Sequence, residues 1–353
     1  MITREPFWKE VLGFARKTAI NWLNALRQKR YTSSMNTAIL QETKLDLPDE
    51  KAVYHGKVRD VYDFGDRLML VATDRYSAFD RVLATVPHKG ALLTQTSRWW
   101  FEQTTSIVPN HIISYPDPNV AYCRKYDVIP LETVVRGYIT GVTNTSLWHT
   151  YSGGQRDYGT FVLPDGLKKN DKLPEPVLTP TTKFETHDRN LTPAEAVATG
   201  LLDRDVWERV SRIALELFRF GQQKAEAAGL LLVDTKYEFG LTPEGEVVLI
   251  DELHTQDSSR YWLRESYAER LAAGEEPENY DKEFLRLWFK ARFDPYAQDS
   301  EAPVVPDDVI AELERRYRFV YERLTGTDFQ PPDTTNIEKR IETNVKKMLL
   351  EQR

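Results

Sequence analysis

The segment LLLVDTKYEFG, residues 230–240, constrains the fold more than any other stretch of the chain. It opens as an apolar run typical of a buried strand and then places Asp234, Lys236 and Glu238 at every second position. Because side chains of a strand alternate between its two faces, we expect these three to stand about 6 to 7 Å apart on one face. A row of charges on a half-buried strand suits a small charged ligand or a metal ion. The opposite face is expected to carry Val233, Thr235, Tyr237 and Phe239.

This strand is expected to turn back on itself. The sequence LTPEGE predicts a turn that leads into VVLIDE, so residues 230–252 should form an antiparallel hairpin. A loop over residues 242–245 would place Lys236 opposite Asp251. That register would complete a cluster of four charged side chains on one face.

Two helices are predicted with clear boundaries. Residues 203–228 place apolar side chains at helical spacing, with Asp203 as a plausible N-cap and Gly229 as a stop. The sequence DDVIAELERRYRFVYERLTG, residues 307–326, is the clearest helix in a C-terminal third that we expect to be helical. The apolar face of the first helix should consist of Val206, Val210, Ile213, Ala214, Leu217 and Phe218.

The region before these helices contains a predicted hairpin and a predicted loop. KVRDVYDFGDRLMLVATD, residues 57–74, predicts two strands joined across residues 63–66, with Gly65 in the turn. Residues 151–193 are rich in proline and polar side chains, which predicts a long loop or lid rather than packed structure.

Composition limits the classes of protein to consider. The 353 residues are enough for two domains, and the net charge of −7 argues against a general nucleic-acid binder, so any anion site must be built locally. A single cysteine, Cys123, excludes an intramolecular disulfide framework and a multi-cysteine zinc site. It indicates a reducing compartment and is expected in the core. The sequence has no apolar run as long as the roughly 18 to 20 residues that a membrane span requires.

The first 34 residues differ from the rest because their basic residues and their apolar residues at helical spacing predict a basic, amphipathic helix. Three interpretations remain open. The segment is an extension before Met35 that catalysis does not need, an organelle transit peptide, or a helix on a membrane surface. Transit peptides avoid acidic residues, and Glu5 and Glu10 disfavour that interpretation.

The charged strand and its hairpin partner could handle a nucleotide. Carboxylates from two adjacent strands, here Glu238 and Asp251, can share a Mg²⁺ ion that bridges phosphates, and Lys236 offers a positive charge. The alternative is a structural charge ladder, in which each cross-strand pair contributes only about 0.2 to 1 kcal/mol.

Three further segments could contact anions, although each could also be an ordinary solvated surface. In HGKVRDVYD, Gly56 permits close backbone approach, and Lys57 and Arg59 project from one face of the expected strand. In IPLETVVRGYITG, Arg136 follows an apolar strand, and a guanidinium can bind phosphate or carboxylate through two hydrogen bonds. The third segment, DELHTQDSSRYW, contributes Asp257, Ser258, Ser259 and Arg260.

The expected lid carries its own candidates. Within TPTTKFETHD, Lys183, His187 and Asp188 are crowded together and are either catalytic or merely solvated. The tetrapeptide HDRN fits no zinc pattern, since metal sites require three or four assembled ligands.

Taken together, these motifs resemble one enzyme family. VIPLETVVRGYITG and LVDTKYEFG look like the two signature segments of the SAICAR synthetase family, and GKVRDVYD, ATDRYSAFD, HKGALLTQTSRWWF, TPTTKFETHD and DELHTQDSSRYW occur in the family's order, over roughly residues 52–265. One departure lies at Val142, where the signature usually has a serine. Thr143, Thr145 and Ser146 are possible replacements for its hydroxyl contact to the substrate phosphate.

The resemblance implies an α+β fold related to kinases and ATP-grasp enzymes, with antiparallel sheets, packed helices and an ATP site between two lobes. We expect residues 1–34 as the N-terminal extension, residues 35–128 as a β-rich ATP-binding lobe, and residues 129–353 as an α+β lobe. The second lobe would carry the substrate site and the lid at about residues 151–193.

The resemblance also implies ATP-dependent ligation of 5-aminoimidazole-4-carboxyribonucleotide (CAIR) to L-aspartate, through an acyl phosphate, in purine biosynthesis. Glu238 and Asp251 would hold Mg²⁺, and residues 127–132 would take adenine. The implied catalytic residues are Lys236, Asp234, Lys183 and Asp188. The implied ATP contacts are Gly56, Lys57, Arg59, Val128, Glu132, Lys236, Glu238 and Asp251. The implied substrate contacts are Asp74, Ser77, Lys89, Arg136, Ser258 and Arg260.

Two other functions remain to be weighed. A phosphotransferase on a related scaffold would use the same ATP residues but bind a different phosphorylated acceptor, and ADP release that depends on aspartate separates it from a ligase. A nucleotide-sensing module would keep the fold without turnover. The expected partners are small molecules, without nucleic acid or a membrane span. The chain is expected to be a cytoplasmic monomer or small homo-oligomer, with an organelle as the alternative if residues 1–34 are a transit peptide.

Overall fold

The structure is a computed structural model that describes residues 38–352 except 144, 184–188 and 298–299. The chain divides into two units, Met1–Thr37 and Ala38–Arg353, and only the second contains described residues. The helix predicted within residues 1–34 lies outside them. None of the helices in the described ranges is both long and apolar enough to cross a membrane.

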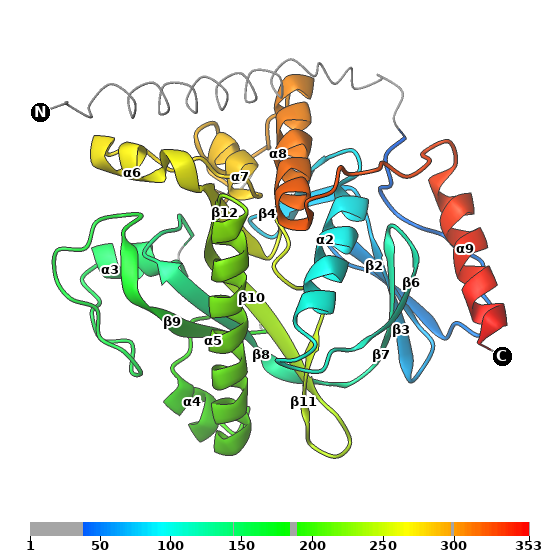
Figure 1. Ribbon diagram of the computed structural model, residues 1–353, viewed down its shortest axis with the longest axis horizontal. Coiled ribbons are helices and arrows are strands. Elements are labelled where there is room, and N and C mark those ends of the chain that lie inside the picture. Colours follow the sequence, from blue (N-terminus) through cyan, green and yellow to red (C-terminus); the bar gives the residue numbers. More distant parts are fainter. Residues whose placement is uncertain (1–37, 144, 184–188, 298–299, 353) are drawn as a thin grey trace, which may run out of the picture. The chain divides into compact units, whose positions relative to one another are not determined.

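The first sheet contains five antiparallel strands in the order β1-β2-β3-β7-β6. Strands β2, β3, β6 and β7 are labelled in Figure 1. The predicted hairpin is confirmed, because β2 and β3 pair and Gly65 adopts a φ of 100° in their turn. Cys123 is buried in this sheet, as expected. The strands are β1 (Ala52–His55), β2 (Arg59–Asp63), β3 (Arg67–Ala72), β6 (Ile112–Asp117) and β7 (Val120–Arg124).

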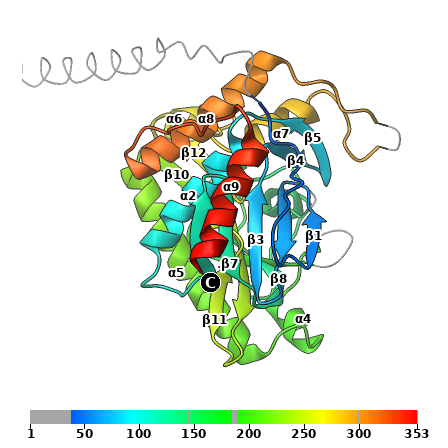
Figure 2. The same cartoon turned by 90° about the vertical axis from the view of Figure 1, so that its right-hand side faces the viewer.

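One face of the first sheet packs against helix α9 (Ile337–Glu351), which lies beside β3 and β7 in Figure 2. Met69 and Val71 of β3 belong to the same buried core as Ile341 and Val345 of α9. Arg340 fixes the helix further, since its guanidinium binds the buried carboxylate of Asp117 through Nε at 3.0 Å and Nη2 at 3.1 Å. Residues near both ends of the described chain therefore build one core.

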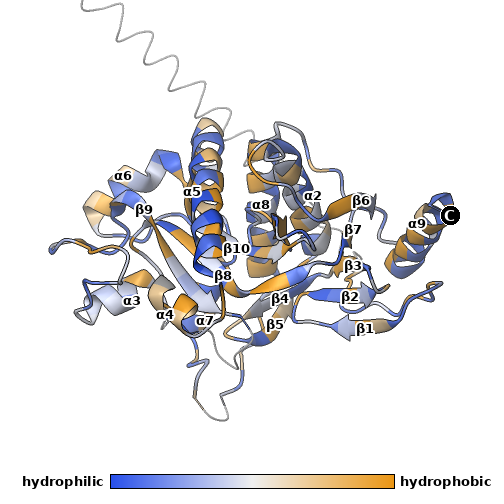
Figure 3. Cartoon of the chain, turned by 90° about the horizontal axis from the view of Figure 1, so that it is seen from below, coloured by the Kyte–Doolittle hydropathy of each residue, from blue (hydrophilic) through white to orange (hydrophobic). Residues whose placement is uncertain are grey.

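The second sheet carries the charged strand. Its order is β11-β10-β8-β9, and β12 also pairs with β10, antiparallel. Helix α5 contacts β10, β8 and β9, and hydrophobic and hydrophilic residues alternate around it in Figure 3. The elements are β8 (Asp127–Tyr138), β9 (Lys172–Thr182), β10 (Leu230–Leu241), β11 (Val247–Ile250), β12 (Ser259–Leu263) and α5 (Arg204–Ala227).

The predicted helices are confirmed. Helix α5 follows Asp203, and Gly229 beyond its end has a φ of 78°. Helix α8 (Asp307–Thr325) ends at Gly326, whose φ of 71° suits glycine. Helices α2, α7 and α8 share a third core with β4. The remaining elements are β4 (Arg75–Ala78), β5 (Arg81–Thr85), α2 (Lys89–Gln103), α3 (Leu147–Ser152), α4 (Pro193–Ala198), α6 (Arg264–Ala273) and α7 (Glu283–Lys290).

The loop predicted over residues 151–193 is wrong in its central part, because β9 is a strand paired with β8. Prolines at positions 174, 176 and 180 suggested irregular structure. They are compatible with β9 because it is an edge strand, where a missing backbone N–H leaves no ladder bond unmade on the outer side.

The predicted hairpin register is also wrong by one residue. β10 and β11 do pair, but Glu238 lies opposite Ile250, and Asp251 has left the strand with a φ of 67°. The loop is shorter than predicted, since Thr242 N donates to Glu246 O at 2.9 Å and Gly245 has a φ of 82°. Lys236 therefore does not lie opposite Asp251.

A bulge changes the expected alternation along β10. Its pairing with β12 shifts between Leu232 and Asp234. Tyr237 and Phe239 join the core beneath α5, as expected for one face. Val233 instead packs in a separate cluster with Leu231, Tyr138 and Trp262.

Candidate active site

Two carboxylates face each other at the centre of the second sheet. Glu132 of β8 and Glu238 of β10 are direct cross-strand partners. Lys236 Nζ lies 2.6 Å from Glu132 Oε1 and 2.8 Å from Glu238 Oε1, and Lys183, just beyond β9, forms an ion pair with Glu238 Oε2. Like charges opposite each other are destabilising. The two lysines supply the compensating charge.

The electrostatics of this cluster follow from its burial and its charges. Burial alone would raise the pKa of Glu238, but Lys236 and Lys183 outweigh it and lower the pKa to about 2. Burial would likewise lower the pKa of Lys236, but Glu238 and Glu132 raise it well above its ordinary value. Glu238 therefore remains ionised and Lys236 protonated near neutral pH.

Arg59 joins the first sheet to the residues that follow β11. Its guanidinium forms an ion pair with Asp251 and places Nη2 2.7 Å from Glu252 Oε2. Although burial would lower the pKa of Arg59, Asp251 and Glu252 raise it, and Glu238 adds to the effect. The Arg59 charge is thus shared between the Asp251 turn and the Glu238 cluster. Sequence reasoning missed Glu252, which directly follows the predicted ligand Asp251.

A second charged row crosses three neighbouring strands. Asp234 of β10 has Arg136 of β8 as its cross-strand partner on one side and Arg260 of β12 on the other. Arg260 forms an ion pair with Asp234, and Arg136 Nη1 lies 3.7 Å from Asp234 Oδ2. Arg136 Nε also donates to Thr179 Oγ1 at 2.7 Å. Two guanidiniums share one carboxylate, which leaves positive charge available for an anion.

Burial makes the uncompensated positive charge of this row energetically unfavourable. It lowers the pKa of Arg136 to about 10, because the attraction of Asp234 does not compensate fully and Arg260 repels it. Arg260 Nε is buried and lacks a hydrogen-bond partner among the described residues. A bound anion would compensate the charge of Arg136 and accept a hydrogen bond from Arg260 Nε.

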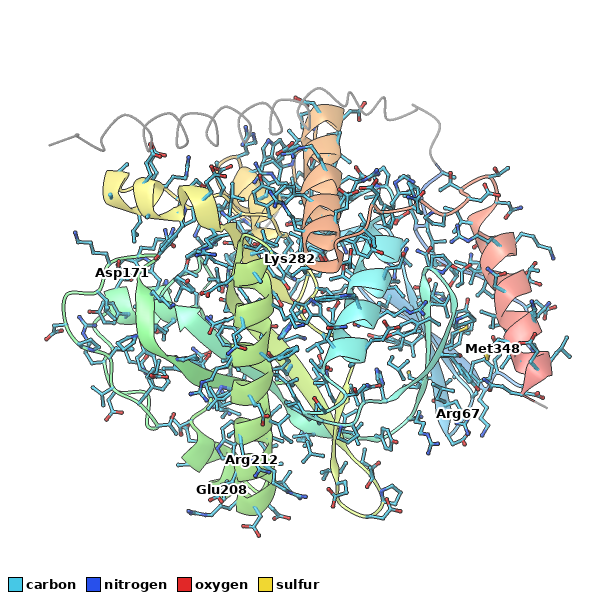
Figure 4. All side chains as sticks on the ribbon, viewed as in Figure 1. Arg67, Asp171, Glu208, Arg212, Lys282 and Met348 are labelled. Carbon is cyan, nitrogen blue, oxygen red and sulfur yellow. The ribbon has the colours of Figure 1, made fainter. Side chains whose placement is uncertain are left out.

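Helix α7 adds residues that sequence reasoning missed. Glu283 Oε2 lies 3.4 Å from Arg260 Nη2 and also forms an ion pair with Arg286. Burial would raise the pKa of Glu283, but these two arginines lower it to about 2. Lys282, labelled in Figure 4, directly precedes Glu283, and burial lowers the pKa of Lys282 to about 8. Only the dense charge of DKEFLR, residues 281–286, signalled them.

Two predicted substrate contacts hold the fold together. Asp74 is buried and accepts hydrogen bonds from Leu40 N at 2.9 Å and Gly90 N at 3.1 Å. Lys89 is buried and lies 2.6 Å from a carboxylate oxygen of Asp257. Neither joins the two charged rows.

The other predicted contacts are dispersed. Lys57 pairs with Asp80, and Gly56 N donates to Arg59 O at 2.8 Å in the turn between β1 and β2. Ser258 Oγ accepts a hydrogen bond from Thr255 N, and Ser77 lies in β4. Val128 is exposed and lies opposite Gly240. Asp188 and His187 lie outside the described residues.

The described residues contain no group of three or more His, Cys, Asp or Glu arranged to hold a metal ion. Mg²⁺ at nucleotide sites is bound through one or two carboxylates together with phosphates and water. Glu238 and Asp251 are carboxylates of the kind that this mode requires, and both raise the pKa of Arg59. The Lys236–Glu238 cluster and the row at Asp234 thus form two separate charged sites along β10.

Comparison with known proteins agrees with these motifs. The family model described as SAICAR synthetase matches residues 52–303. A phosphoribosylaminoimidazole-succinocarboxamide synthase from Legionella pneumophila (strain Paris) is 56% identical over 287 residues, 81% of this chain and 91% of the relative. A chloroplastic enzyme of the same name from Arabidopsis thaliana is 51% identical over 313 residues, 88% of this chain and 76% of the relative.

Solved structures extend the similarity to the fold. SAICAR synthase from Saccharomyces cerevisiae, complexed with SAICAR, superposes with a TM-score of 0.70 at 33% identity, over 82% of this chain and 99% of that one. A SAICAR synthetase (Type-2) in complex with ADP gives a TM-score of 0.60 at 25% identity, over 79% of this chain and 100% of that one. The predicted α+β class with antiparallel sheets is confirmed.

Proposed function

The chain belongs to the SAICAR synthetase family, and from this premise we propose how its residues divide the work of the reaction. The enzyme is a carbon–nitrogen ligase of purine biosynthesis that joins CAIR to L-aspartate. ATP is cleaved to ADP and phosphate, and SAICAR is the product. One observation carries the residue assignment: the two charged rows lie two residues apart on β10, at Asp234 and at Lys236–Glu238.

We assign the row of Glu132, Lys236 and Glu238 to ATP. Lys236 and Lys183 would neutralise phosphate charge, and Glu238 with Asp251 would hold Mg²⁺. When bound, Mg²⁺ would supply positive charge that stabilises the phosphoryl group during transfer. Without nucleotide the same carboxylates are satisfied by Lys183, Lys236 and Arg59. Residues 127–132 and the β1–β2 turn, with Gly56 and Lys57, would contact the rest of ATP.

We assign the row of Arg136, Asp234 and Arg260 to the ribonucleotide. Arg136 and Arg260, which both lie beside Asp234, would bind the phosphate of the ribonucleotide through paired hydrogen bonds. Asp234 keeps both guanidiniums oriented before the substrate arrives. Glu283 supports Arg260 from the other side.

The chemistry requires activation of a carboxylate, which is a poor acylating agent because oxide is a poor leaving group. We propose that the γ-phosphoryl group of ATP passes to the CAIR carboxylate, releasing ADP and forming an acyl phosphate. The aspartate amine then attacks the acyl carbon, the C–N bond forms, and phosphate leaves while the amine loses a proton. The residues act mainly by positioning and by charge neutralisation.

A coupled assay of ADP release tests this function. With CAIR, L-aspartate, ATP and Mg²⁺ present, we expect release, and omission of any one substrate should abolish it. Release that continues without aspartate would indicate a phosphotransferase. Nucleotide binding without release would indicate a binding module.

The proposed division into lobes follows the two sheets. Residues 35–128 would form the ATP-binding lobe and residues 129–353 the substrate lobe, although α9 packs on the first sheet. We also propose that the enzyme acts in the cytoplasm as a monomer or small homo-oligomer. The chloroplastic relative motivates the alternative that residues 1–34 direct an organelle form. A fusion of those residues to a fluorescent protein distinguishes the two.

A further inference from the structure

Arg75, the first residue of β4, is buried against the turn between β1 and β2. Its Nη2 donates to Gly56 O at 2.8 Å, and its Nε donates to Lys57 O at 3.2 Å. Its Nη1 donates to Gln41 O. One guanidinium therefore binds two successive carbonyl oxygens of the turn that we assign to ATP.

The charge of Arg75 is compensated by Asp60 rather than by a ligand. Arg75 Nη2 lies 2.8 Å from Asp60 Oδ1, and Asp60 is fully buried. Asp60 Oδ2 in turn accepts hydrogen bonds from Thr43 N at 2.7 Å and Thr43 Oγ1 at 2.9 Å. A guanidinium carries five donors in a planar fork, so it can bind a carboxylate and several carbonyls at once. Lysine, with a single nitrogen, has no such geometry.

The next carbonyl of the turn is bound by the same segment. Val58 O accepts hydrogen bonds from Thr73 N at 3.0 Å and Thr73 Oγ1 at 2.8 Å. In a planar trans peptide the N–H points opposite to the C=O of the same unit. The amides of Lys57 and Val58 share peptide units with the carbonyls that Arg75 binds, so both amides point away from β4.

These two amides can receive an anion. Within the described part of the chain, neither Lys57 N nor Val58 N has a recorded hydrogen-bond acceptor. Successive backbone N–H groups that point to one side form a concave site for phosphate. The side chain of Lys57 is exposed at the same turn. The turn thus offers donors on its outer side because its carbonyls are bound on the inner side.

Strand β4 is itself anchored to the rest of the chain. Tyr76, which follows Arg75, is fully buried, and its hydroxyl donates to Lys282 O at 2.7 Å. Its ring shares a core with Leu285 and Phe289 of α7, and Figure 2 shows β4 and β5 beside that helix. Arg75 therefore extends from a fixed element, as a group that orients a binding site requires.

We propose that Arg75 is a positioning residue for ATP. It binds the carbonyl side of the β1–β2 turn and thereby directs the amides of Lys57 and Val58 to the phosphates, without touching the nucleotide. This inference rests on the proposed assignment of the turn to ATP and deepens it, because it names the residue that shapes the turn.

The test compares Arg75→Lys with the wild type in calorimetric titrations with ADP and with adenosine, in the presence of Mg²⁺. Lysine keeps the charge beside Asp60 but cannot bind both carbonyls. We expect the Kd for ADP to rise about tenfold or more, because hydrogen bonds to charged phosphate are lost. The Kd for adenosine should stay within about twofold of wild type, since adenosine has no phosphate.

Steady-state kinetics provide a second measurement. In Arg75→Lys the KM for ATP should rise about tenfold or more, while the KM values for CAIR and aspartate stay within about twofold. Arg81→Lys, an exposed substitution on β5 of the same hairpin, is the matched control and should resemble wild type in both measurements.

The double variant Arg75→Met with Asp60→Asn removes both buried charges and guards against a folding defect from an unpaired Asp60. It should lose affinity for ADP and keep affinity for adenosine. Equal losses for ADP and adenosine, or an unchanged Kd for ADP in either folded variant, overturn the inference. So does an equal rise in the KM values for ATP and CAIR. Failure of the proposed function would instead appear in the wild type, as absence of ADP binding or of CAIR-dependent ADP release.

Discussion

Glu132 and Glu238 lie directly opposite each other on neighbouring strands, and the amino group of Lys236 binds both. The pair concentrates negative charge at the centre of a sheet, where hydration is reduced. The lysines that neutralise it in the ligand-free chain also provide the positive charge that phosphates require. The same residues can thus stabilise the fold and receive ATP.

Metal ligation by Glu238 can be separated from a structural charge ladder. Glu238→Gln keeps size and removes charge, so if the cluster is only structural, the variant should lose stability but little activity. If Glu238 binds Mg²⁺, the variant should lose at least 100-fold in turnover, which is about 2.7 kcal/mol of barrier. Excess Mg²⁺ or Mn²⁺ should then restore part of the activity. Steady-state rates over a metal titration, with thermal unfolding in parallel, provide the measurement.

Asp251→Asn should behave like Glu238→Gln. Glu208→Gln, on the exposed side of α5 and labelled in Figure 4, is the control and should match wild type. Near-normal turnover with unchanged metal dependence in both test variants would show that the alternation on β10 is structural.

Substitution of Arg136 or Arg260 by lysine keeps the charge and removes the planar two-pronged donor. We expect the KM for CAIR to rise about tenfold or more while the KM for ATP barely changes. Arg212→Lys, an exposed substitution on α5, is the control. If the KM values for CAIR and ATP rise equally, the separation of the two rows into two ligand sites is wrong.

The pH dependence of stability should report on Glu238. Its pKa is lowered from 4.5 to about 2 in the folded chain. A carboxyl with a lowered pKa stabilises the fold fully above its unfolded pKa, and this contribution is lost as pH falls through the folded pKa. The difference in unfolding free energy between wild type and Glu238→Gln should therefore be constant near neutral pH and shrink below about pH 4.5. Urea unfolding at several pH values measures it, and a difference that grows on acidification contradicts the assignment.

Arg340→Met removes the guanidinium bound to the buried carboxylate of Asp117. Because Asp117 would remain buried with only uncharged donors such as Asn344, we expect a loss of about 3 kcal/mol in unfolding free energy. Chemical denaturation measures this loss. Lys339→Met, on the exposed side of the same helix, should change stability by less than about 0.5 kcal/mol. Similar losses in both variants would mean that the Asp117 contact contributes nothing special.

Removal of residues 1–34 should leave turnover within about tenfold of wild type, which is about 1.4 kcal/mol of barrier. Every residue assigned to ATP or to substrate lies beyond Met35. The comparison requires equal unfolding temperatures in the two proteins. A truncated enzyme that folds normally and yet turns over more slowly than this limit would place a functional contact in the removed segment.

Local patterns predicted much of the fold, and long-range pairing set the limit. The 3.6-residue period of α5 and the turn at Gly65 depend on neighbouring residues, so both could be identified from the sequence. The register at Asp251 depended on a turn that is one residue shorter than expected, and such a slip changes every opposite pair. Local patterns could not tell that β9, despite its prolines, pairs at a sheet edge.

The candidate site shows the same division. Asp234, Lys236 and Glu238 were identified by their spacing within one strand. Their partners come from distant segments, since Glu132 reaches Glu238 only through the pairing of β8 with β10. Glu283 and Arg286 join Arg260 through the packing of α7, for which the spacing of charges gives no register.

The packing of α9 on the first sheet has a consequence for biosynthesis of the enzyme. Met69 and Val71 leave the ribosome early, yet the helix that covers them is translated far later. At the usual rates of translation the delay is on the order of tens of seconds. Throughout that interval the nascent first sheet exposes an apolar face, so chaperones that recognise such surfaces should bind it until α9 emerges.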